Sequence, residues 1–245
     1  MLSKTQNKYI RSLSQQKFRK EYNVFIVEGD KMAREWLNSP SNIQMIVGLE
    51  GWLKDNEALL KKHPEAEVCS ILPHELEAIS SLQTPNQALL AVAMAEESTA
   101  LPLNEWCIAL DNIQDPGNMG TIIRIADWFG VQHIICSDDC VDIYNPKVIQ
   151  AGMGSHLRVH LHRSGFKDFI AGTKMPVLAA VLGGENVYKF NKINAGVLLI
   201  GNESKGISAE TVHAATHKIT IPRKGGAESL NAAVSTGILC ALLIS

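Results

Sequence analysis

The sequence predicts an α/β protein in which a small α/β/α domain precedes a domain with a mostly parallel sheet. From residue 106 onward, short and nearly continuous apolar runs alternate with helical segments, which is typical of a parallel sheet covered on both faces. Residues 96–102 are first polar and then interrupted by proline, as in a linker. We therefore expect one domain over residues 1–95, a linker over 96–103, and a second domain over 104–245.

The first domain is predicted from short apolar runs that alternate with amphipathic segments. At about 95 residues, it lies near the lower end of common domain sizes. Its expected elements, in order, are a basic helix at about 4–20, a strand at 24–27, a helix at 31–38, a strand at 43–47, a helix at 52–62 and a strand at 88–93.

The second domain has a more regular rhythm. Its expected strands lie at 106–110, 133–137, 156–161, 177–182, 197–200 and 218–221, with helices between them. A helix is predicted over 118–129, with Gly130 as the glycine that follows its C-cap. The last helix, within 229–245, is apolar at helical spacing, so it either seals the core or pairs with a second subunit.

The charge of the chain is unevenly distributed. The net charge is −2, but residues 1–34 hold eight Lys or Arg against three acidic residues, which gives +5 there and leaves −7 elsewhere. A basic terminus on an acidic body favours binding of a polyanion such as RNA. A solvated helical face explains the same charges equally well.

Other bulk features exclude several protein classes. Residues 1–20 are polar and basic, so we expect no signal peptide, and no apolar stretch reaches the length of a membrane span. The five cysteines form no CxxC pair, which favours reduced thiols in a cytoplasmic protein. Cys136, Cys140 and His133 lack a second ligand pair at zinc spacing, so we expect no metal site.

Three segments carry the chemistry of this sequence. Residues 118–124, 199–203 and 221–231 each place small or polar residues after an apolar run or at the start of the next helix. Ligands of open α/β sheets bind at that edge, so the three segments predict one composite site. The chain has no GxxxxGK[ST], GxGxxG or GxSxG motif, which argues against kinases, dinucleotide-dependent dehydrogenases and α/β-hydrolases.

Arg124 stands among apolar neighbours in its predicted helix. A buried or half-buried Arg needs an anion, so we expect it to bind a phosphate or a developing oxyanion. The structural alternative is an ion pair with Asp111, Asp115 or Asp127.

The other polar residues have structural alternatives too. Asn118 and Ser229 are both good helix N-caps, whereas Asn231, in the first turn of its predicted helix, has less structural reason to be there. Glu203 either accepts a hydrogen bond from a ligand or caps the next helix. Gly201 permits close approach of a ligand or of a second backbone segment.

The three segments together resemble the three motifs of the SpoU (TrmH-type) class of SPOUT RNA methyltransferases. They read N-x-G-x-x-x-R, G-N-E-x-x-G-I-S and I-P-x-x-G-x-x-E-S-L-N, and the resemblance runs from about Trp106 to the C-terminus. Residues 25–29 (FIVEG) and 84–87 (TPNQ) are similar to landmarks of the substrate-binding domain that often precedes this family's catalytic domain.

The resemblance implies 2′-O-methylation of a ribose in structured RNA, either rRNA or tRNA, with S-adenosylmethionine as donor. It also implies a SPOUT-type sheet with a C-terminal trefoil knot and a homodimer with its site near the subunit interface. By position, the catalytic and substrate-facing residues would be Asn118, Arg124, Glu203, Ser229 and Asn231. Those lining the cofactor pocket would be Gly201, Ile221 and Leu230.

Some residues depart from the family pattern. Arg223 and Lys224 stand where family loops often begin with methionine, and Ala232 and Ala233 replace a more usual pair that contains valine. A guanidinium stays protonated at neutral pH, so we expect Arg124 to orient groups and stabilise charge while an RNA phosphate takes the proton. The alternatives to an enzyme of this family are a non-catalytic RNA-binding or ribosome-assembly factor on the same fold and a small-molecule α/β enzyme.

Overall fold

The computed structural model describes residues 2–96, 104–163 and 165–244, so most of the predicted linker lies outside the described residues. The chain forms two compact units: Met1–Glu96 with Tyr144–Leu157, and Glu97–Ile143 with Arg158–Ser245. No helix in the described ranges is both long and apolar enough to cross a membrane.

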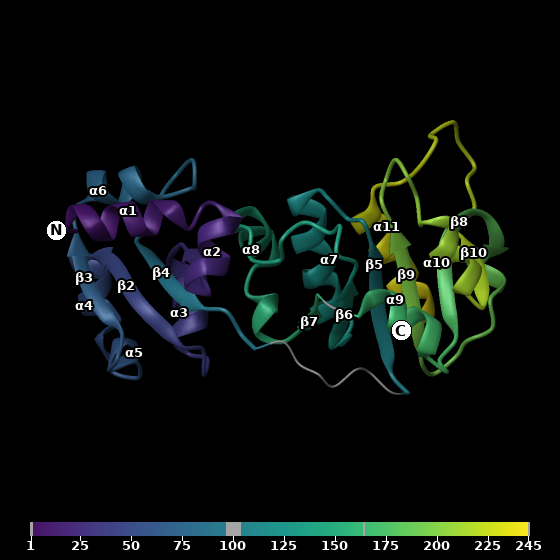
Figure 1. Ribbon diagram of the computed structural model, residues 1–245, viewed down its shortest axis with the longest axis horizontal. Helices are drawn as coiled ribbons and strands as arrows, with labels where there is room; N and C mark the ends of the chain where they lie inside the picture. The colour runs from purple at the N-terminus through teal and green to yellow at the C-terminus, as the bar shows by residue number, and fades with distance from the viewer. Residues whose placement is uncertain (1, 97–103, 164, 245) are drawn as a thin grey trace. The chain divides into compact units, whose positions relative to one another are not determined.

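The first unit is built around a four-stranded mixed sheet of order β1-β4-β2-β3 (Figure 1). Strand β4 is antiparallel to both β1 and β2, and β3 is parallel to β2. Its elements are α1 (Lys4–Ser12), α2 (Gln16–Tyr22), β1 (Val24–Glu28), α3 (Asp30–Leu37), β2 (Ile43–Leu49), α4 (Glu50–Asp55), α5 (Glu57–Leu60), β3 (Glu67–Ile71), α6 (Pro73–Ile79), β4 (Ala88–Ala93), α8 (Pro146–Gly152) and a 3-10 turn at Ser155–Leu157.

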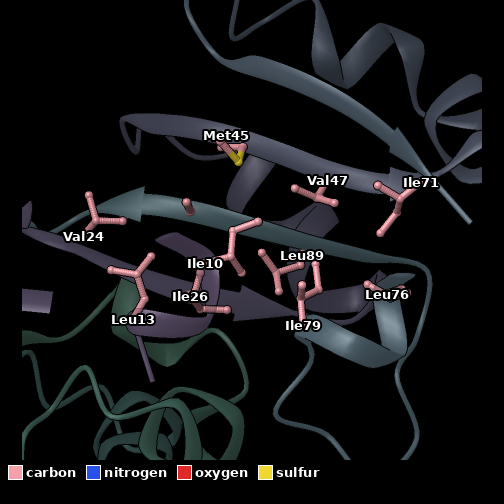
Figure 2. Packing of buried hydrophobic residues seen from close by; sticks show 11 residues of the cluster. Ile10, Leu13, Val24, Ile26, Met45, Val47, Ile71, Leu76, Ile79 and Leu89 are labelled. Carbon is pink, nitrogen blue, oxygen red and sulfur yellow. The ribbon is translucent and has the colours of Figure 1, made fainter. Parts of the chain in front are cut away.

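One face of this sheet is covered by α1 and α6. Ile10 of α1 and Ile79 of α6 pack on Ile26 of β1 and Leu89 of β4 in a continuous apolar cluster (Figure 2). The predicted α/β/α organisation is therefore confirmed. It also determines which side of α1 faces the core, namely the side that carries Ile10.

Several predictions for this unit were wrong in detail. The helix expected at 4–20 is two helices, because α1 ends at Ser12 and the backbone is extended at Gln15. The helix expected at 52–62 is likewise divided into α4 and α5. Strand β3 and helix α6 were not predicted at all. Strand β3 is mostly exposed, so it lacks the apolar run by which strands are recognised in a sequence.

The segment Tyr144–Leu157 comes from the middle of the predicted second domain but packs within the first unit. The ring of Tyr144 lies 4.7 Å from that of Phe25 in β1, centroid to centroid. Helix α8 also packs on β1. The first unit is thus completed by a segment from the second half of the chain.

The second unit contains a six-stranded, entirely parallel sheet of order β10-β8-β9-β5-β6-β7 (Figure 1). Helices α7 and α11 pack together on one face, and α9 packs on the other. Its elements are β5 (Trp106–Asp111), α7 (Pro116–Trp128), β6 (His133–Cys136), β7 (His160–His162), α9 (Phe166–Gly172), β8 (Val177–Asn186), a 3-10 turn at Val187–Lys189, β9 (Gly196–Gly201), α10 (Ala209–Ala214), β10 (His217–Thr220) and α11 (Ala232–Leu243).

The parallel sheet confirms the predicted fold class and brings the carboxyl ends of its strands to one edge. Gly130 has a φ of +71° directly after the C-cap of α7, as predicted. The strand expected at 156–161 is displaced, because residues 155–157 form a 3-10 turn and β7 begins at His160. The threading of a trefoil knot stays a prediction.

Candidate active site

A cavity of about 640 Å³ lies in the second unit, where β9 and β10 end. Its walls come from the middle of β8, the loop after β9, the loop after β10 and the part of α11 up to Leu239. The lining residues are 180–182, 200–207, 219–225, 227–230, 232, 235 and 239. Two of the three predicted motif segments therefore form most of one cavity.

The loop after β9 is a tight turn held by Asn202. The amide and carbonyl of Asn202 pair with those of Gly206, at 3.1 and 2.9 Å. The Asn202 side-chain oxygen accepts from the amides of Ser204 and Lys205, at 2.9 and 3.0 Å, while its amide group donates to the carbonyl of Asn112 at 3.0 Å. Sequence reasoning missed this positioning residue, although an Asn after a strand-ending Gly is a recognisable turn signal.

Gly201 is required by this turn. A Cβ atom at Gly201 would lie 2.4 Å from the carbonyl carbon of Gly206 and from the amide nitrogen of Ile207. The sequence left open whether a ligand or a second backbone segment approaches Gly201. The structure shows that a second backbone segment does. The glycine thereby shapes the cavity wall.

The start of α7 differs from its prediction. The N-cap is Asp115, whose carboxylate accepts from the Asn118 amide at 2.7 Å, and Pro116 occupies the first helical position. The structural alternative for Asn118, a cap of this helix, therefore does not hold. Because Asp115 satisfies the helix end, the side chain of Asn118 is available for other contacts.

Asn118 joins the other two motif segments through its side chain. Its amide group donates to the half-buried carboxylate of Glu203, and its side-chain oxygen accepts from the Asn231 amide group at 2.8 Å. Three residues from three distant segments thus form one hydrogen-bonded chain at the strand ends. Glu203 is consequently not the cap of the next helix, since Ser208 occupies that position before α10.

Asn231, not Ser229, is the N-cap of α11. Its side-chain oxygen accepts from the amides of Ala233 and Val234, at 2.9 and 3.2 Å. The structural alternative for Ser229, a cap of this helix, does not hold, because Ser229 lies in the preceding loop. There it is exposed and lines the cavity together with Leu230.

Arg124 lies apart from this network. Its side chain is exposed, because Ile122, Ile123 and Ala126 point into the core from the other side of α7. Within the described part of the chain it forms no ion pair or hydrogen bond. The expectation of a buried or half-buried Arg124 was therefore wrong, and so was the structural ion pair offered as its alternative.

The three carboxylates considered as partners of Arg124 have other roles. Asp127 pairs with Arg158 at 2.8 Å, Asp115 caps α7, and Asp111 accepts from the Ser208 amide at 2.9 Å. None of these three carboxylates therefore pairs with Arg124, and a structural ion pair within one chain does not explain its guanidinium.

An unusual thiol lies behind the strand ends. A hydrogen bond from the Cys136 thiol, assisted by one from Ser137, lowers the pKa of Cys140 to about 7, although its burial opposes this shift. The Cys140 thiol lies 3.4 Å from the carbonyl of Leu110, close to the loop that leads into α7. Across the described residues, no group of three or more His, Cys, Asp or Glu side chains is placed to hold a metal ion.

Comparison with protein families assigns both parts of the chain. Residues 105–241 match the SpoU rRNA Methylase family, and residues 4–91 match the MRM3-like substrate binding domain. The first match contains all three motif segments and covers more than half of the chain.

Individual relatives match over nearly the whole length. The 23S rRNA (guanosine(2553)-2′-O)-methyltransferase RlmP of Bacillus subtilis is 28% identical, over 94% of this chain and 92% of its own. A putative RNA methyltransferase of the TrmH family from Porphyromonas gingivalis has a similar structure, with a TM-score of 0.86 and 33% identity over 99% of this chain and 98% of its own. The AdoMet-bound rRNA methyltransferase from Sinorhizobium meliloti gives a TM-score of 0.87 and 29% identity over 99% and 95%.

These matches confirm the resemblance seen in the motifs, together with the reaction class and the methyl donor that it implies. The chain belongs to the SpoU rRNA methylase family of RNA 2′-O-ribose methyltransferases.

Proposed function

We propose that this protein methylates the 2′-hydroxyl of one ribose in large-subunit ribosomal RNA. The observation that carries the proposal is the hydrogen-bonded chain Glu203–Asn118–Asn231, which joins the three motif segments beside one cavity. RlmP of Bacillus subtilis, similar over nearly its whole length, is named for this reaction on 23S rRNA.

The cavity fits S-adenosylmethionine in size and in lining. Its volume of about 640 Å³ lies within the usual range of small-molecule sites, and its lining includes the apolar Leu230, which is 45% exposed to solvent. Gly201 and Ile221 border the same space and would contact the donor mainly through their backbones. When bound there, the donor supplies an activated methyl group on a sulfonium.

The residues of the chain then have the task of positioning the ribose. A 2′-hydroxyl must lie in line with the methyl group, and the negative charge that grows on its oxygen must be stabilised. Hydrogen bonds hold the side chains of Asn118 and Asn231 in place, because Asn118 donates to Glu203 and accepts from Asn231. We assign Glu203 and Ser229 to contacts with the nucleotide and Arg124 to charge stabilisation, with an RNA phosphate as proton acceptor.

We further propose that the protein acts as a homodimer. One face of α7 exposes Arg124 together with Trp128, whose side chain is 84% exposed, and the neighbouring α11 exposes Val234 at 52%. A large exposed apolar side chain beside an unpaired cation is typical of a surface that a partner covers. In such a dimer, Arg124 would meet its anion across the interface.

The first unit is proposed to bind the RNA around the target, and the protein to work in the cytoplasm. The family of its matching domain is described as substrate binding. The described cysteines are all free, in keeping with a reducing compartment.

The proposal is tested with labelled S-adenosylmethionine and unmodified 23S rRNA, followed by digestion of the RNA to nucleosides. We expect label in a 2′-O-methylnucleoside with the wild type and none with Arg124→Ala. Label in a methylated base would contradict the proposed reaction. Cofactor binding without transfer to any RNA would favour the alternative, a non-catalytic RNA-binding factor.

A further inference from the structure

We infer that one face of α1 is a binding site for the phosphodiester backbone of the RNA substrate, formed by Lys4, Lys8 and Arg11. These three residues are called the α1 stripe below. The inference rests on the proposed function, since it names the surface by which the first unit holds RNA.

The geometry of α1 places the three cations together. Positions 4, 8 and 11 are separated by four and three residues, so they lie on one side of a helix. The core-facing side is that of Ile10, which is 2% exposed and packs on the sheet (Figure 2). All three cations are exposed and point away from that core.

The α1 stripe has no neutralising partner among the described residues. None of the three side chains forms an ion pair there, whereas two other exposed cations of the same unit do: Arg34 pairs with Asp30 at 2.6 Å and Lys61 with Glu57 at 2.8 Å. Between residues 2 and 22 there are six Lys or Arg and one Glu. This segment therefore carries a net positive charge, and no ion pair among the described residues neutralises the α1 stripe.

The helix dipole makes the position of Lys4 unfavourable for the protein alone, whereas Arg11, in the last turn, is favourably placed. Lys4 occupies the first position of α1, and the first turn contains no acidic residue. Even the capping box that starts the helix is uncharged, because Ser3 is paired with Gln6 rather than with a Glu. A cation near a helix N-terminus is destabilising, so local stability does not explain Lys4. A bound polyanion would.

Charge in this region has two separate uses. Arg19, in the next helix, is 1% exposed and donates from one Nη to the carbonyls of Leu13 and Ser14, at 2.9 and 2.8 Å. It fixes the turn between α1 and α2 and is not available to RNA. The α1 stripe makes no such contact, which separates it from the structural part of the basic segment.

The span of the α1 stripe suits consecutive phosphates. Seven residues of α-helix rise about 10 Å, so the three cations are spread widely enough to contact more than one phosphate of a strand. Contacts of this kind position RNA without reading its sequence. The site therefore takes a phosphodiester backbone and not a particular base.

The test compares wild-type protein with K4Q/K8Q/R11Q, using an unmodified 23S rRNA transcript as probe. Dissociation constants are measured between 50 and 200 mM KCl. Losing three phosphate contacts reduces the slope of log K against log salt by about 2, so the affinity difference between the proteins shrinks about 16-fold across that range. We also expect a raised KM for RNA, with kcat, S-adenosylmethionine affinity and the unfolding midpoint not lowered.

Two further variants separate charge from structure. K54Q/K61Q/K62Q removes the same charge from α4 and from the two residues that follow α5, and should keep the wild-type salt slope. K4R/K8R/R11K keeps the charge and should bind as the wild type does. An equal salt slope in wild type and K4Q/K8Q/R11Q would overturn the inference, and so would an equal loss in the α4–α5 variant.

The outcome does not depend on the proposed reaction. A wild-type protein that methylates no RNA, but whose salt slope falls in K4Q/K8Q/R11Q, would refute the reaction and retain the α1 stripe. If the wild-type protein methylates rRNA but the salt slope is the same in K4Q/K8Q/R11Q, the reaction is retained and the α1 stripe is refuted.

Discussion

Replacing Gly201 by alanine should damage the cofactor cavity more than any other single-methyl change in its lining. The new Cβ would lie 2.4 Å from two backbone atoms of the 206–207 segment and 2.6 Å from the Gly206 carbonyl oxygen. Ordinary contacts of a Cβ begin near 3.4 Å, so that segment must move by roughly 1 Å. Overpacking of this kind costs about 1–3 kcal/mol.

The backbone that must move is also a wall of the cavity, so the strain should appear in ligand affinity. A loss of 1.4 kcal/mol corresponds to about a tenfold weaker Kd. Calorimetric titration with S-adenosylmethionine should therefore show a loss of about fivefold to 100-fold, or no binding, together with a lower unfolding midpoint. Gly225→Ala is the matched control, because Gly225 also lines the cavity but a Cβ there meets nothing within 4 Å. Equal affinities of wild type and Gly201→Ala would refute the role given to this glycine.

Three other predictions concern the site and its surroundings. Asn118→Asp places a second carboxylate against Glu203. In single-turnover assays, the rate of methyl transfer should fall by at least 100-fold, while the affinity for RNA stays within threefold of the wild type. An unchanged rate of transfer would show that the network is only structural. Arg124→Lys should lower kcat by tenfold or more without changing the unfolding midpoint, since the side chain is exposed; full activity would exclude a role for the guanidinium. Cys140, with its pKa lowered to about 7, should react with iodoacetamide before Cys107, because burial raises the pKa of Cys107 to about 12. The rate of Cys140 alkylation should rise nearly tenfold from pH 5 to 6 and level off above pH 7. Mass spectrometry of the alkylated peptides measures both rates.

The fold and the meeting of the motif segments could be predicted because both depend on the order of strands. Parallel strands end at one edge, so Asn118 and Glu203 were expected near each other from their positions after apolar runs. The same reasoning found no signal for β3, whose residues are mostly exposed. An edge strand of this kind is held by its neighbour β2 and not by an apolar pattern of its own.

The roles of individual polar residues were harder to predict, because several nearby residues compete for each position. Asp115 and Asn118 are both good caps, and Pro116 at the first helical position was the signal that favoured Asp115. Ser229 and Asn231 compete in the same way, and here the helix begins late enough to place Ser229 in the cavity wall. Arg124 was misjudged from its sequence neighbours, although helical periodicity already places it on the face opposite to the core.

The most direct test of the account is to remove the atom that the protein is proposed to methylate. Once the target nucleotide has been mapped, a ribosomal RNA with a single 2′-deoxynucleotide at that position is compared with its unmodified counterpart. The account predicts that both RNAs bind with the same Kd and that only the one with a 2′-hydroxyl accepts label from S-adenosylmethionine. Label in the deoxy-substituted nucleotide would contradict 2′-O-methylation at this site.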